Sequence, residues 1–104
     1  MKPNKRKRLE KAGWKVSDAQ EFLGLSPEEA EYIDLRIRLG EAVRRLREER
    51  QLTQVEVAAR MGSSQSRVAK AEAADNSVSL DLLIRSLLAL GASRQDLAEA
   101  IVGR

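Results

Sequence analysis

Helix start signals recur along this chain more regularly than any other feature. A serine or threonine stands directly before each apolar stretch with helical spacing, at Ser26, Thr53, Ser63 or Ser64, Ser79 and Ser93. Such residues begin helices because their side-chain oxygens accept backbone N–H bonds from the first turn. β-Branched and aromatic residues never alternate over a useful length, so strands are not expected. The sequence therefore predicts an all-α chain of about five helices.

The spacing of apolar residues and the turn signals set the expected bounds. We expect helices over about 27–51, 54–61, 65–73, 80–90 and 94–102. Gly40 interrupts the first helix and is interpreted as a close-packing site rather than a kink. In the fourth helix the buried face is expected to consist of Leu80, Leu83, Ile84, Leu87 and Leu88.

The stretch from Gln54 to Glu72 is the most informative part of the chain. Two helices that cross steeply over a short turn need a small residue at their contact, a turn residue that tolerates positive φ, and an inward aliphatic residue. Ala58, Gly62 and Val68 supply these in order, and Val57 and Met61 are apolar at the remaining inner positions. The joint pattern predicts a helix-turn-helix over about 54–73.

This stretch resembles the lambda-repressor-like, Cro-type (XRE) helix-turn-helix family. The matching residues are Leu46-Arg47, Leu52-Thr53-Gln54, Ala58, Gly62-Ser63-Ser64-Gln65-Ser66, Val68 and Glu72. The resemblance covers roughly Leu39 to Ile101 and implies a five-helix DNA-binding domain over 26–104, after a basic and amphipathic helical extension over 1–25. One departure is Ala74, which stands where the family usually has glycine. We therefore expect this helix end to be capped differently, through Asp75 or Asn76.

The resemblance also implies which residues contact DNA. The second helix of the motif is expected to lie in the major groove, where base edges can be distinguished. Its outward polar residues, expected to contact bases, are Gln65, Ser66, Arg67 and Lys70. Glutamine can pair with adenine through two hydrogen bonds, and arginine with O6 and N7 of guanine. The residues expected to contact phosphates are Thr53, Gln54 and Ser64.

Two further charged positions are expected to serve the structure rather than DNA. In the resembling family, the positions of Arg47 and Glu72 form a partly buried ion pair between the first helix and the recognition helix. Removing one partner of a well-buried pair leaves an unpaired charge.

Composition excludes several kinds of site. The 104 residues include no histidine and no cysteine, which excludes disulfides, catalytic thiols, zinc sites of the Cys/His type and imidazole acid–base chemistry. The acidic residues lie mainly at helix starts and on predicted exposed faces, so we expect no enzyme, no metal site and no cofactor. No apolar run approaches the roughly 18–20 residues that cross a bilayer. A cytoplasmic protein without a membrane partner is expected.

Charge is distributed in blocks. Residues 1–16 are mainly basic, the charges of 17–34 are all acidic, and 36–50 are mainly basic, within a net charge of +3. The basic excess favours a polyanion partner, and double-stranded DNA is the expectation. A twofold homodimer would place two recognition helices about 34 Å apart over a near-palindromic operator.

The N-terminal region extends the resemblance. Gly13-Trp14, the run from Phe22 to Ala30, and Ser77-Val78-Ser79-Leu80-Asp81-Leu82-Leu83 resemble HigA-type antitoxins and related regulators. This implies a protein that represses its own operon and binds a small basic ribonuclease toxin of the HigB/RelE type. The acidic block could face such a cationic surface, with Trp14, Phe22 and Leu23 as apolar contacts to toxin or dimer partner.

Three alternatives stay open at this point. In the first, Trp14 and Phe22 instead fold back over the long helix. The second is a stand-alone repressor without a toxin. A helical adaptor that binds protein or RNA is the third reading, and DNA binding without sequence preference would favour it.

Overall fold

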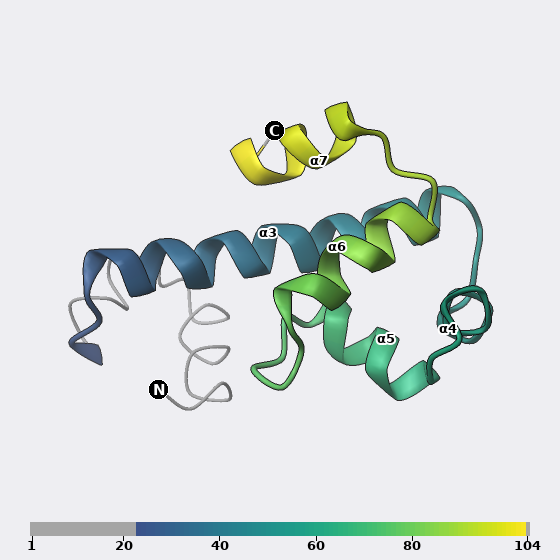
Figure 1. Cartoon of the computed structure of the whole chain (residues 1–104), viewed down its shortest axis with the longest axis horizontal. Coiled ribbons are helices and arrows are strands. Elements are labelled where there is room, and N and C mark those ends of the chain that lie inside the picture. The colour runs from purple at the N-terminus through teal and green to yellow at the C-terminus, as the bar shows by residue number, and fades with distance from the viewer. Residues whose placement is uncertain (1–22, 104) are drawn as a thin grey trace. The chain divides into compact units, whose positions relative to one another are not determined.

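The computed structural model describes residues 23–103 and confirms the predicted all-α fold. Within that range five helices are present (Figure 1): α3 (Pro27–Glu49), α4 (Gln54–Met61), α5 (Gln65–Glu72), α6 (Leu80–Ala89) and α7 (Arg94–Val102). No strand occurs among these described residues. The chain divides into two compact units, Met1–Leu35 and Arg36–Arg104. Helix α3 belongs to both, and α4 to α7 lie in the second unit.

Each helix begins at a predicted capping residue. The Ser26 hydroxyl accepts the Glu29 N–H at 3.2 Å, and the Glu29 carboxylate accepts the Ser26 N–H at 3.4 Å. The other four helices start with the same kind of bond, accepted by the hydroxyls of Thr53, Ser64, Ser79 and Ser93. Each bond satisfies an N–H that has no partner within its own helix. The local sequence therefore determines where every described helix starts.

The core of the second unit is built from one face of each helix. Its buried apolar residues are Leu39, Ala42, Val43, Leu46, Val57, Ala58, Val68, Ala71, Val78, Leu82, Leu83, Leu87, Leu90 and Ala100. Helix α4 packs against α5 and α6, and α5 also packs against α6. In Figure 1, α7 lies on the opposite side of α6 from α4 and α5.

The predicted buried face of α6 was partly wrong. Leu88 is 53% exposed, whereas Ser86 is fully buried between Leu82 and Leu90 in the helical stripe. The Ser86 hydroxyl donates to the Leu82 carbonyl oxygen at 2.7 Å, so burial leaves no polar group unsatisfied. The buried face of α6 is therefore rotated away from the predicted stripe, toward Leu82, Ser86 and Leu90.

The end of α5 also differs from the prediction. Ala74 adopts φ +53°, and the Asp75 N–H donates to the Lys70 carbonyl oxygen at 2.9 Å. A left-handed residue followed by this bond is the usual glycine-type helix end, here made with alanine. The expectation of a different cap was therefore wrong, because the backbone keeps the glycine geometry. Gln51 makes the same kind of end for α3, with φ +56° and a bond from the Leu52 N–H to the Arg47 carbonyl oxygen.

Ala74→Gly is expected to stabilise the protein by about 0.5–1 kcal/mol. A left-handed conformation costs a residue with a Cβ atom about 1–2 kcal/mol, and the greater freedom of glycine in the unfolded chain offsets part of the gain. Ala73→Gly is the matched control, because Ala73 has φ −85° and glycine can only weaken it. Urea denaturation should move the two midpoints in opposite directions. A shift of the same sign would contradict the proposed strain.

Candidate nucleic-acid interface

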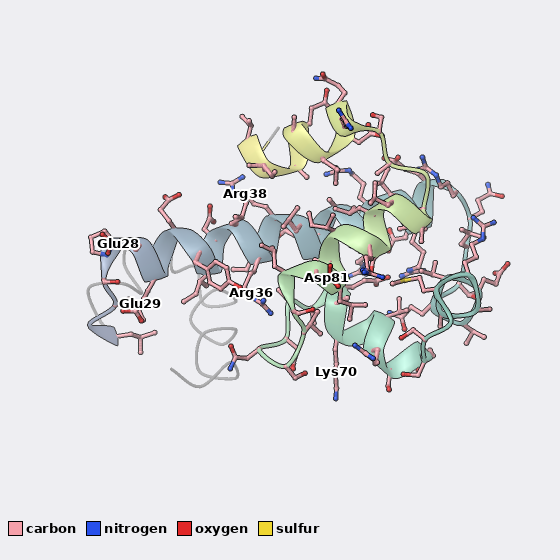
Figure 2. The ribbon with its side chains drawn as sticks, in the orientation of Figure 1. Glu28, Glu29, Arg36, Arg38, Lys70 and Asp81 are labelled. Atoms are coloured by element: carbon pink, nitrogen blue, oxygen red, sulfur yellow. The ribbon has the colours of Figure 1, made fainter. Side chains whose placement is uncertain are left out.

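Helices α4 and α5 form the predicted helix-turn-helix. Gly62 ends α4 with φ +63°, and the Ser63 N–H donates to the Ala58 carbonyl oxygen at 2.9 Å. Buried Val68 and Ala71 fix the inner face of α5. The four residues predicted to contact bases, Gln65, Ser66, Arg67 and Lys70, are all exposed on the remainder of the helix. Figure 2 shows Lys70 pointing outward from α5.

A chain of hydrogen bonds links the exposed face of α5 to α4. The Gln65 amide nitrogen donates to the Gln54 amide oxygen at 2.6 Å. The Gln54 amide nitrogen in turn donates to the Glu72 carboxylate at 3.1 Å. Both groups of the Gln54 amide are therefore engaged, and its orientation is fixed from both sides. Gln54, which is predicted to contact phosphate, thus orients Gln65, which is predicted to contact a base.

Arg47 of α3 extends this chain of hydrogen bonds by donating to Glu72. Its guanidinium donates twice to the Glu72 carboxylate, with an Nη2–Oε1 distance of 3.0 Å, and once to the Leu52 carbonyl oxygen at 2.9 Å. The Arg47 and Glu72 side chains are 14% and 6% exposed. The hydrogen bond to Glu72 and the charge of that carboxylate raise the pKa of Arg47. The pair joins α3 to the end of α5 and anchors Gln54.

The hydroxyls predicted to contact phosphates also cap helices. Thr53 Oγ1 accepts the Glu56 N–H at 3.1 Å, and the Glu56 carboxylate accepts the Thr53 N–H at 3.0 Å. The hydrogen bonds from the Thr53 backbone N–H and the Thr53 side chain lower the pKa of the Glu56 carboxyl at the start of α4. Ser64 Oγ accepts the Arg67 N–H at 3.3 Å. Both hydroxyls therefore serve the helix starts, and Ser64 Oγ also lies 3.3 Å from Ser66 Oγ.

The predicted base contacts lie on two sides of α5. Gln65 is bonded to α4, whereas Arg67 lines a hollow of about 440 Å³ together with Asp81, Arg85 and Leu88 of α6. Ser63 lines the same hollow, and its hydroxyl oxygen is buried without a hydrogen-bond partner in the described range. The structure therefore joins Gln65 to Gln54 and keeps Arg67 apart from them.

The remaining sequence predictions concern the N-terminal region, metals and membranes. Trp14 and Phe22 lie outside the described residues, and Leu23 is half-buried. Among residues 23–103 no group of acidic side chains is arranged to hold a metal ion. In the same range no helix is both long enough and apolar enough to cross a membrane.

One buried charged residue, Arg36, was not predicted from the sequence. Arg36 is only 8% exposed, and its guanidinium contacts the connection between α5 and α6. Its spacing could have indicated burial, because Arg36 lies three, four and seven residues before the buried Leu39, Gly40 and Val43 on the same helical face. A charged residue in such a stripe is buried only when polar partners face it.

Comparison with known proteins identifies the fold family. A family model described as a helix-turn-helix domain matches residues 38–100. No curated protein and no solved structure matches the chain. The matched range contains both helices of the motif and the whole Gln65–Gln54–Glu72–Arg47 chain of hydrogen bonds. The protein therefore belongs to the helix-turn-helix domain family of the lambda-repressor (XRE) type.

Proposed function

We propose that the protein is a sequence-specific transcriptional regulator that reads the major groove of DNA with α5. Membership of the helix-turn-helix family indicates a DNA-binding regulator. The observation that supports sequence-specific reading is the hydrogen-bonded chain from Arg47 through Glu72 and Gln54 to Gln65. It holds an exposed glutamine in one orientation before DNA arrives, which reduces the ordering cost of binding.

The chemistry of Gln65 favours adenine. Its amide nitrogen carries two hydrogens, and one of them is directed at Gln54. The second hydrogen and the amide oxygen remain for a base edge. Adenine offers N7 as an acceptor and its N6 amino group as a donor in the major groove, which matches that pair of groups. On the other side of α5, Arg67 is suited to O6 and N7 of guanine.

Gln65→Ala is expected to lower discrimination at one base pair of each half-site by about 1–3 kcal/mol. Other positions should keep their preferences, because Arg67 and Lys70 are not part of the Gln65 network. The matched control is Gln95→Ala, which removes an exposed glutamine from α7. Competition binding against every single-base-pair variant of the selected operator would measure both. A uniform loss at all positions for Gln65→Ala would contradict base reading by this residue.

The dimeric arrangement belongs to the same proposal. Two copies related by a twofold axis would cover two half-sites of a near-palindromic operator, one helical turn apart. Inserting about five base pairs between the half-sites turns one of them to the opposite face of the DNA. Such an insertion should abolish cooperative binding and leave weak binding to single half-sites. Unchanged affinity would indicate that a monomer is the binding unit.

An antitoxin role in an autoregulated operon is the finer part of the proposal. Glu28, Glu29 and Glu31 are exposed in the first turns of α3, and Tyr32 beside them is 48% exposed. An acidic surface with an aromatic residue suits a cationic partner such as a small RNA-cleaving toxin. Figure 2 shows Glu28 and Glu29 at the start of α3.

Co-expression with the product of the neighbouring gene tests this role. The full chain should restore growth if that neighbour is toxic, and Glu31→Lys with Tyr32→Ala should weaken the rescue by reversing charge and removing an aromatic contact. Glu41→Lys is the matched control, because it reverses an exposed charge further along the same helix. A harmless neighbour that forms no complex would leave a stand-alone repressor.

A further inference from the structure

Arg36 ties α3 to the segment that follows the recognition helix. Its Nη2 atom donates to the Asp75 carbonyl oxygen at 2.7 Å and to the Val78 carbonyl oxygen. Figure 2 shows the side chain leaving α3 toward this connection. A buried guanidinium must be satisfied by acceptors, and here backbone oxygens serve. Arg36 also lies outside the family match, which begins at residue 38.

The connection held by Arg36 is part of the end of α5. The Asp75 N–H donates to the Lys70 carbonyl oxygen at 2.9 Å, directly after the left-handed Ala74. The Asp75 carboxylate accepts the Ser77 N–H at 2.9 Å, so residues 75–77 form one bonded turn. A displacement of the Asp75 carbonyl group would therefore also move the last turn of α5, which carries Lys70.

The last turn of α5 is held at two points, by Arg47 through the Glu72 carboxylate and by Arg36 through the Asp75 carbonyl oxygen. Gln65 at the first end is oriented by Gln54, which belongs to the chain of bonds through Glu72 and Arg47. Lys70 lies near the other end, where the turn at Asp75 is held by Arg36. Lysine is a flexible point charge, so its backbone position is what limits where its ammonium group can bind.

We propose that Arg36 is a positioning residue for DNA recognition, which sets the last turn of α5 and thereby the base pairs read by Lys70. This inference rests on the proposed function of α5 as a recognition helix. It predicts that loss of Arg36 impairs base discrimination unevenly along the operator. General destabilisation of the domain would instead weaken binding to all duplexes by a similar factor.

The test compares Arg36→Met with Arg45→Met in the full chain. Both substitutions remove one positive charge from α3, but Arg45 is exposed and lies 4.0 Å from Glu49. Competition binding with all single-base-pair operator variants is measured for each, and Lys70→Ala defines the base pairs that depend on Lys70. Arg36→Met should lower discrimination about fivefold or more at those base pairs, a fraction of what one base contact contributes. At the base pair whose discrimination is lost in Gln65→Ala, discrimination by Arg36→Met should stay within about twofold of that of the parent protein.

Arg36→Lys keeps the test valid if the methionine variant does not fold. Lysine retains the charge and three N–H donors but has a shorter side chain and no planar guanidinium, so an intermediate loss at the same base pairs is expected. An even loss across all positions in Arg36→Met or Arg36→Lys, or no more loss than in Arg45→Met, would overturn the inference while leaving the proposed function intact. If the parent protein binds all sequences equally, the inference about Arg36 and the proposed function both fail, and this result is obtained with the parent protein alone.

Discussion

Gly40→Ala is expected to destabilise the protein by about 2–3 kcal/mol, although alanine is the better helix former by about 1 kcal/mol. A Cβ atom on Gly40 would lie 2.7 Å from the Ala71 carbonyl oxygen and 3.1 Å from that of Glu72. Both atoms are backbone, so no side-chain rotation can relieve the contact. Helices α3 and α5 would have to move apart, and α5 is the proposed recognition helix. DNA affinity should therefore fall together with stability.

Gly62→Ala provides the comparison for this prediction. A Cβ atom there meets nothing within 4 Å, but φ is +63°, so the expected cost of about 1 kcal/mol comes from backbone strain alone. Urea denaturation followed by helical circular dichroism would give both values. Stabilisation by Gly40→Ala, as at an open helical position, would show that α3 and α5 are not in this close contact.

Much of the fold could be predicted because its signals are local. Serine and threonine caps depend only on the few residues that follow them, and the described helices begin where these residues stand. The helix-turn-helix was recognisable for a related reason. Ala58, Gly62 and Val68 each meet a steric requirement of one turn, so their spacing can be recognised without the rest of the chain. Gly40 also proved to be a close-packing site, as predicted.

Features that depend on distant partners were missed. The sequence gives no sign that Gln54 bonds to Gln65, because the two approach only after α4 and α5 have crossed. Arg36 was assigned simply to a basic block, since two of its acceptors are backbone oxygens about forty residues away. The prediction for the helix end at Ala74 was wrong for another reason. Residue preference argued against a left-handed alanine, and packing around α5 outweighs that preference.

Glu72→Ala has the largest expected effect on the site, a loss of about 3–5 kcal/mol in the free energy of unfolding. Truncation would leave the Arg47 guanidinium, 14% exposed, with only the exposed Glu48 carboxylate 4.0 Å away among the described residues, and would also remove the acceptor for the Gln54 amide. The exposed pair Asp81–Arg85 is the matched control, with side chains 72% and 73% exposed and a 2.9 Å contact. Asp81→Ala should cost at most about 1 kcal/mol, because water screens such a pair.

The double variant Arg47→Met/Glu72→Leu separates stability from recognition. Replacing both charges by apolar side chains removes the unpaired guanidinium, so most of the stability lost in Glu72→Ala should return. DNA discrimination at the Gln65 base pair should not return, because Gln54 still lacks the carboxylate that fixes its amide. Recovery of both properties would mean that Glu72 affects DNA only through folding. Recovery of stability alone would establish that the buried pair orients the reading residue.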